Sequence, residues 1–156
     1  MSNKLDSIDK IILKSLQEEG RLSNVELAKR CDMSAPPCLR RLRNLEKQGI
    51  IQGYHADLSS DALGFGLNVF VYISLEGQSA FALEAFESHI KPLDYVRECY
   101  RVTGEVDYIL KVVAKSWEDY EAYLVSNIIN FKGIKSVKTQ ITMKTTKKLA
   151  GVPVED

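Results

Sequence analysis

The sequence predicts a protein of the α+β class, in which a helical segment precedes a segment that mixes strands with helices. Up to residue 47, apolar side chains recur every three or four positions, which is the period of an amphipathic helix. In residues 67–75 the period changes to two, which is the period of a strand. From there on the patterns follow the order strand, helix, strand, strand, helix, strand, so we expect two domains.

Residues 21–53 contain two short helical patterns with a tight turn between them. The apolar positions of the first pattern are Val25, Leu27, Ala28 and Cys31, and those of the second are Leu39, Leu42 and Leu45. Ser23 stands before the first pattern and Glu26 follows three residues later, which is the spacing of a capping box. The second pattern ends before Gly49. Two short helices joined by such a turn are typical of a helix-turn-helix, whose second helix enters the major groove of DNA.

The outward face of the second helix carries groups that suit DNA. If its leucines point inward, Arg40 and Asn44 point away from the domain, and these side chains match guanine and adenine edges. Arg41 and Arg43 lie on the flanks of this face, where they suit phosphate oxygens. The alternative is a solvated basic face on an ordinary helical hairpin. The capped helix pair of the right spacing favours DNA binding.

The formal net charge is zero, with 21 basic and 21 acidic side chains, which by itself argues against a nucleic-acid partner. The charges are unevenly divided, because residues 1–53 hold ten basic and seven acidic side chains. A basic N-terminal module on a slightly acidic second domain fits a DNA-binding protein. Since the excess is small, we expect that useful affinity needs two or more copies.

Several other classes are disfavoured by composition. No run approaches the roughly 20 apolar residues of a membrane span, and the N-terminus lacks a signal-peptide pattern. Cys31, Cys38 and Cys99 are odd in number and lie in apolar patterns, so we expect reduced structural thiols in a cytoplasmic protein. Neither His55 nor His89 is near them in the sequence, and we expect no metal and no cofactor.

The expected elements divide the chain into three segments. These are a DNA-binding domain at residues 1–53, a hinge strand and linker at 54–66, and a second domain at 67–156. The expected helices outside the helix-turn-helix lie at residues 7–19 with Ser7 as cap, at 78–91, and at 116–131. The expected strands lie at residues 53–58, 67–75, 95–102, 108–114 and 134–143. The tail from residue 144 is expected to be frayed.

The second domain has the βαββαβ order of ferredoxin-like folds. Both helices of this arrangement cover one face of a four-stranded sheet and leave the other face bare. Phe70 and Tyr72 alternate with the aliphatic positions of residues 67–75, so they lie on the bare face. Because a lone, water-exposed sheet does not favour aromatic side chains, we predict a homodimer with Phe70 and Tyr72 in its interface.

Three stretches together resemble the Lrp/AsnC (leucine-responsive/asparagine-responsive, or feast/famine) transcriptional regulators. They read LDSIDKIILKSLQEEGRLSNVELAKR, CDMS followed by PPCLRRLRNLEKQGIIQGY, and VTGEVDYILKV, and the resemblance covers nearly the whole chain. It implies an N-terminal winged helix-turn-helix, a hinge strand and a C-terminal amino-acid-sensing domain. It also implies double-stranded DNA and an amino-acid effector as partners, dimers that join into octamers, and a nucleoid-associated protein.

The resemblance further implies the residues of two sites. The implied DNA-facing residues are Ser34, Pro36, Pro37, Arg40, Arg41, Arg43 and Asn44. The effector is implied to lie near a Gly-x-x-Asp turn, with Tyr100, Thr103, Gly104, Asp107, Tyr108, Gln140 and Thr142 as candidate contacts. Asp107 suits an α-ammonium group, and backbone N–H groups near Gly104 suit an α-carboxylate. The alternative is a β-hairpin turn in which Gly104 supplies a positive φ and Asp107 bonds the turn backbone.

Two other functions remain as alternatives. Some relatives of this architecture decarboxylate tetrapyrroles with His and Arg side chains. Here the only histidines are His55 and His89, and no catalytic triad, phosphate loop or metal-ligand spacing appears, so we expect a regulator rather than an enzyme. The other alternative is an effector-binding module whose helix-turn-helix does not bind DNA.

Overall fold

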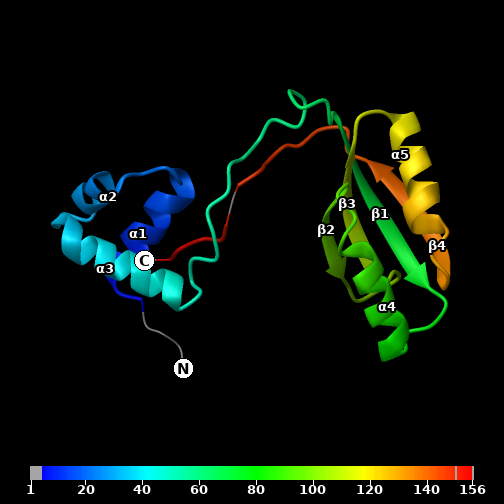
Figure 1. Cartoon of the computed structure of the whole chain (residues 1–156), viewed down its shortest axis with the longest axis horizontal. Coiled ribbons are helices and arrows are strands. Elements are labelled where there is room, and N and C mark those ends of the chain that lie inside the picture. Colours follow the sequence, from blue (N-terminus) through cyan, green and yellow to red (C-terminus); the bar gives the residue numbers. More distant parts are fainter. Residues whose placement is uncertain (1–4, 150, 156) are drawn as a thin grey trace. The chain divides into compact units, whose positions relative to one another are not determined.

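The computed structural model describes residues 5–149 and 151–155, which belong to two compact units (Figure 1). The first unit runs to Asp57 and also takes in the chain from Lys147, and the second is Leu58–Thr146. The linker expected at residues 54–66 is therefore divided between the units, and the tail joins the N-terminal unit from Lys147 onward. Among the described residues, no helix is both long and apolar enough to cross a membrane.

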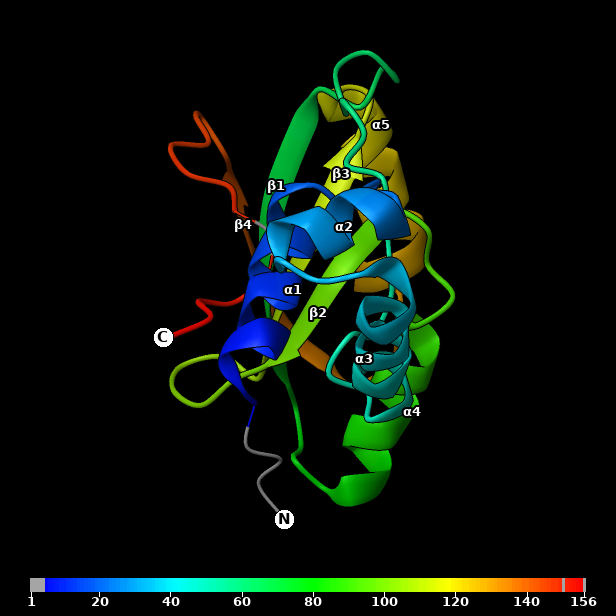
Figure 2. The same cartoon turned by 90° about the vertical axis from the view of Figure 1, so that its left-hand side faces the viewer.

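The first unit is built from α1 (Ser7–Glu18), α2 (Asn24–Arg30) and α3 (Ala35–Lys47) (Figure 2). Its core is formed by the buried residues Ile12, Leu27, Ala28, Cys31, Cys38, Leu42 and Leu45. The predicted apolar stripes of the helix-turn-helix are confirmed except at two positions. Leu39 is only partly buried, and Val25 is wrong as a core residue because it is 56% exposed. The predicted cap of α1 is wrong by one residue. Asp6 rather than Ser7 is the N-cap, because its carboxylate forms a reciprocal capping box with Asp9.

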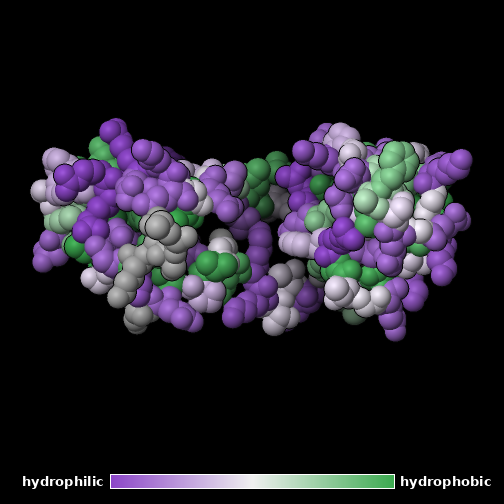
Figure 3. Space-filling model, turned by 90° about the horizontal axis from the view of Figure 1, so that it is seen from below, coloured by the Kyte–Doolittle hydropathy of each residue, from purple (hydrophilic) through white to green (hydrophobic). Residues whose placement is uncertain are grey.

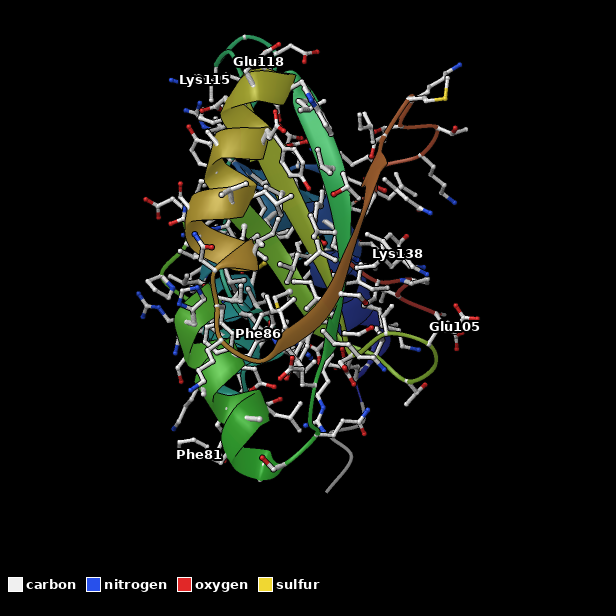
Figure 4. The ribbon with its side chains drawn as sticks, turned by 90° about the vertical axis from the view of Figure 1, so that its right-hand side faces the viewer. Phe81, Phe86, Glu105, Lys115, Glu118 and Lys138 are labelled. Carbon is white, nitrogen blue, oxygen red and sulfur yellow. The ribbon has the colours of Figure 1, made fainter. Side chains whose placement is uncertain are left out.

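The second unit contains a four-stranded antiparallel sheet in the order β2-β3-β1-β4. Its elements are β1 (Leu67–Leu75), α4 (Ala80–Ile90), β2 (Val96–Arg101), β3 (Tyr108–Ala114), α5 (Trp117–Leu124) with the π-helical turn Val125–Ile129, and β4 (Ile134–Ile141). Figure 4 shows α4 and α5 on one side of the sheet. The predicted βαββαβ arrangement is confirmed.

The core of the second unit lies between the sheet and its helices. Val69, Val71 and Ile73 of β1 are fully buried there. Phe70 and Tyr72 alternate with them and lie on the face opposite the helices, where Phe70 is 37% exposed. The predicted bare face is therefore present. In the view of Figure 3, the surface of both units is mainly hydrophilic, with hydrophobic residues gathered in separate patches.

Two segments differ from their predicted structure. Residues 53–58 form no strand, because nothing in the described chain pairs with their backbone. Instead, the Tyr54 hydroxyl donates to Glu46 Oε1 at 2.9 Å, and burial together with this carboxylate raises the pKa of Tyr54 to about 12.

The tail, predicted to be frayed, makes two side-chain contacts in the first unit. Lys148 Nζ lies 2.6 Å from Asp57 Oδ1, and the Val152 N–H donates to Gln17 Oε1 at 2.9 Å.

Candidate DNA-reading helix and effector pocket

A sharp turn joins the end of α2 to the start of α3. Ser23 caps α2, because its Oγ accepts from the Glu26 N–H at 3.2 Å while its own N–H donates to Glu26 Oε2 at 2.9 Å. This is the predicted capping box. After α2, Asp32 adopts a positive φ of 50°, a conformation that aspartate tolerates better than most residues. The Met33 N–H then bonds back to the Ala28 carbonyl, so the chain reverses within a few residues.

The outward face of α3 carries exposed polar side chains. Arg40, Arg43 and Asn44 are exposed, whereas Cys38, Leu42 and Leu45 on the opposite face are buried. Ser34 is the N-cap residue of α3, yet its hydroxyl makes no capping hydrogen bond. Pro36 and Pro37 occupy the first turn, where proline removes no internal hydrogen bond. The start of α3 therefore exposes a hydroxyl group and proline rings beside Arg40.

Arg41 is engaged inside the domain. Its Nη1 lies 2.6 Å from Asp6 Oδ2 and 2.9 Å from Asp9 Oδ1, so it joins α3 to the start of α1. The Asp9 N–H and the Arg41 guanidinium lower the pKa of Asp6, and the two carboxylates raise the pKa of Arg41. The sequence suggested a phosphate contact for Arg41, but its charge is already compensated within the unit.

Asp107 fastens the turn between β2 and β3 to the end of β1. Its Oδ2 accepts from the Leu75 N–H at 2.8 Å, and its Oδ1 accepts from Gln78 Nε2 at 2.7 Å. Its own N–H donates to the Ile73 carbonyl at 2.9 Å. Gly104 has a φ of 121°, which is rarely available to other residues. Of the structural alternative for this turn, the positive φ of Gly104 is present, whereas the Asp107 carboxylate bonds the backbone of β1 and not that of the turn.

Two cavities flank this turn. One has a volume of about 310 Å³ and is lined by Ser74, Leu75, Gln78, Gly104, Glu105, Val106, Asp107, Lys135, Ser136 and Lys138. The other has a volume of about 590 Å³ and is lined by Gln78, Leu83, Arg101, Val102, Thr103, Gly104, Val106 and Asp107. Figure 4 shows Glu105 and Lys138 on the side of the sheet that the helices leave open. Anionic and cationic groups thus face the same small volume, which suits a zwitterion.

The turn brings together three of the residues suggested for the effector site: Thr103, Gly104 and Asp107. Tyr100 lies on the open face of β2, where its hydroxyl donates to Glu98 Oε2. Tyr108 is not at the pocket. It is buried on the helix side, where its hydroxyl donates to Glu87 Oε1 and burial raises its pKa.

Gln140 and Thr142 also lie away from the turn within one chain. Gln140 pairs with Phe70, and the Thr142 N–H donates to the Asn68 carbonyl, both near the start of β1. The turn contacts the opposite end of β1, at Leu75. The two residues therefore belong to the sheet face that also carries Phe70.

Sequence reasoning missed Ser74, Gln78, Lys135, Ser136 and Lys138 as pocket residues. They come from the end of β1, the loop before α4 and the start of β4. Their neighbourhood follows from the strand order, because β1 lies between β3 and β4. The alternation of β4 was the available signal, since it puts Ser136 and Lys138 on one face, opposite Val137.

The cysteines divide into two kinds. Cys31 and Cys38 are buried in the core of the first unit, and burial raises the pKa of the Cys31 thiol to about 11. The Cys31 thiol therefore stays protonated, and both side chains pack within the apolar core. Cys99 is exposed, although it was expected to be a structural thiol within an apolar pattern. Its strand β2 is at the edge of the sheet, so one side of it is uncovered.

A helix-turn-helix unit joined to a ferredoxin-like unit with a polar pocket defines a DNA-binding regulator with a ligand-binding domain. Comparison with known proteins agrees. The family model described as "Winged helix-turn-helix DNA-binding" matches residues 5–52, and that described as "Lrp/AsnC ligand binding domain" matches residues 68–152. The chain belongs to the Lrp/AsnC family of DNA-binding transcriptional regulators.

Relatives match over almost their full length. The leucine-responsive regulatory protein of Rhizobium meliloti (strain 1021) is 39% identical over 97% of this chain and 97% of that protein. The protein of the same name in Escherichia coli (strain K12) is 40% identical over 92% of this chain and 87% of that protein.

Solved structures share the whole architecture. A transcriptional regulator of Neisseria meningitidis in complex with L-Met matches with a TM-score of 0.92 at 33% identity, covering 96% of this chain and 97% of that one. E. coli AsnC matches with a TM-score of 0.86 at 28% identity, covering 96% of this chain and 99% of that one.

Proposed function

We propose that this regulator binds an α-amino acid at the turn around Asp107 and reads its operator through the outward face of α3. The observation that carries the proposal is the chemistry of the smaller cavity. It combines the carboxylate of Asp107 with the ammonium groups of Lys135 and Lys138. A free amino acid carries both charges that these groups complement, and the L-Met complex of the Neisseria regulator supports the same ligand class.

For DNA, the proposed contacts are Ser34, Pro36, Pro37, Arg40, Arg43 and Asn44. The exposure of Arg40 and Asn44 supports a role in reading base edges, and the exposure of Arg43 supports a phosphate contact. Arg41 acts instead as a positioning residue, because its two carboxylate partners hold α3 against α1.

For the assembly, we propose a homodimer through the open sheet face, with higher assemblies up to an octamer. Support comes from Phe70 of β1, which remains 37% exposed. The effector acts by favouring one assembly, because a ligand shifts an equilibrium only through different affinities for its states. The chain then works as a nucleoid-associated regulator and not as an enzyme.

The decisive experiment is selection of binding sites from genomic fragments, with and without a mixture of amino acids. We expect enrichment of a common sequence, and a change in the length or spacing of the protected DNA when the effector is present. Enrichment of no sequence would leave a ligand-binding module without DNA binding as the better description. A site pattern that is identical with and without amino acids would reject the proposed coupling.

A further inference from the structure

The hydrogen bond between Gln78 and Asp107 lies where the two cavities of the sensor unit meet. Both cavities are lined by Gln78, Gly104, Val106 and Asp107. Beyond these shared residues, their linings differ in chemistry. The smaller cavity adds mostly polar and charged side chains, among them Ser74, Ser136 and Lys138, whereas the larger one adds Leu83, Val102, Thr103 and Arg101. A ligand with one charged end and one apolar end could place one end in each cavity. To do so, it has to extend across the site of the hydrogen bond between Gln78 and Asp107.

We propose that Gln78 is a specificity-determining residue of the effector site: its amide occupies Asp107 in the ligand-free sensor, and the effector's α-ammonium group displaces it. This inference rests on the proposed binding of an amino acid at Asp107. Asp107 Oδ2 is committed to the Leu75 N–H at the end of β1, whereas Oδ1 is held by a side chain that can move. The carboxylate of Asp107 forms an ion–dipole contact with the neutral amide of Gln78. An ammonium group in the same place adds the attraction of a full positive charge, so the exchange is favourable.

The position of Gln78 allows it to leave Asp107 without unfolding a neighbouring element. It lies in the loop between the end of β1 and the start of α4, directly after Gly77. A Cβ at Gly77 would meet no atom within 4 Å, so this part of the loop is not packed. Ser79 caps α4 through its own hydroxyl, which accepts from the Ala82 N–H at 3.2 Å. The cap of α4 therefore does not depend on the amide of Gln78.

Displacement of Gln78 joins the two cavities and decides which side chain the effector can carry. The charged end of the amino acid then lies between Asp107 and Lys138. Its side chain points toward Leu83, Val102 and Val106, which line the larger cavity. Leu83 is buried and belongs to the core cluster, so this wall is apolar. An amino acid with an apolar side chain is favoured over one with a polar side chain, because the latter would lose hydration there.

Titration calorimetry with the full chain tests this inference, using L-methionine, L-leucine and L-asparagine as ligands. We expect methionine and leucine to bind about tenfold or more tightly than asparagine, on the scale of one unpaired polar group. Gln78→Ala is expected to raise the affinity for methionine about tenfold, because the competing donor is gone. Gln78→Glu should also raise it, since a carboxylate cannot donate to Asp107. Glu84→Ala, at an exposed position of the following helix α4, is the control and should change nothing.

Weaker methionine binding by Gln78→Ala would show that Gln78 contacts the ligand directly. Unchanged binding would show that the hydrogen bond between Gln78 and Asp107 does not compete with the ligand. Either result overturns the inference, and tighter binding of asparagine overturns the assigned ligand class. If neither the wild type nor any variant binds these amino acids, the proposed function fails instead. The contact is then tested by hydrogen exchange of residues 76–79, which should be faster in Gln78→Ala than in the wild type. Equal exchange rates would reject it.

Discussion

Arg40 and Arg41 are adjacent in α3, but their side chains have different surroundings. Arg40 is exposed on the outward face, whereas Arg41 is paired with Asp6 and Asp9 of α1. The exposure of Arg40 and Asn44 was predictable, because a helical period fixes which side chains face the core. The pairing of Arg41 was not, because its partners lie 35 and 32 residues earlier and meet it only through the packing of α1 on α3.

Arg40→Ala should weaken binding to the selected operator by about 1–3 kcal/mol and relax base preference at one position. The reason is that a base-edge contact distinguishes sequences. The measurement is the Kd on operator and on random DNA at one fixed salt concentration. Arg43→Ala is the matched comparison, and we expect it to weaken both DNAs alike because phosphates carry no sequence. If both variants lose the same fraction on both DNAs, the division between reading and positioning is wrong.

Arg41→Ala should lower the melting temperature of the protein by a few degrees while leaving base preference unchanged. The effect should depend on pH. The folded-state pKa of Asp6 lies below its usual value of 3.8, so the pair stabilises the fold above that value and the contribution is lost as the pH falls through the lowered pKa. Thermal melts of wild type and variant should therefore differ at neutral pH and converge in acid. A difference that persists at the acid end would contradict this origin.

At the scale of elements, each helix and strand that has its own period was predictable. Residues 67–75 were predicted as a strand and form β1 with the same bounds. Segments whose structure depends on distant partners were not predictable. Tyr54 bonds Glu46, although residues 53–58 were predicted as a strand. The tail residue Val152 bonds Gln17, although the tail was predicted to be frayed. The same limit holds for the pocket, because Gln78 meets Asp107 only through the pairing of β1 with β3.

The two caps of the helix-turn-helix give a matched pair of substitutions. Ser23→Ala should destabilise the protein by about 1 kcal/mol, because the Ser23 hydroxyl accepts from the Glu26 N–H. Ser34→Ala is the control, since the Ser34 hydroxyl makes no capping hydrogen bond. It should leave stability nearly unchanged and affect DNA binding instead. Denaturant titration measures both variants, and equal losses of stability would show that the capping contact is not the cause.

At the scale of the whole molecule, the zero net charge conceals an uneven distribution. The N-terminal segment is slightly basic and the remainder is slightly acidic, so the chain as a whole has little attraction for DNA. If several copies bind DNA together, their contacts add to the affinity, which is the physical reason for the proposed homodimer. The open sheet face with Phe70 and Tyr72 is the surface available for it.

Phe70→Asp should dissociate the dimer and reduce DNA binding, although Phe70 lies outside the reading helix. A buried carboxylate facing its own copy across an interface is costly. Phe81→Asp is the matched control, because Phe81 is 82% exposed at the start of α4, on the helix side of the sheet (Figure 4). Sedimentation at micromolar concentration should give monomer for the first variant and the wild-type assembly for the second. If only Phe81→Asp dissociates the assembly, the interface is formed by the helix side of the sheet and not by its open face.

Because the end of the tail contacts the first unit, a fluorescent label on the tail lies on the helix-turn-helix unit. Lys148 contacts Asp57 and Val152 contacts Gln17, so the described tail residues from Lys147 onward belong to the helix-turn-helix unit. A fluorescent dye on Glu155→Cys, with the exposed Cys99 replaced by serine, would accordingly report operator occupancy. A dye in the loop at Gly77 would report the effector.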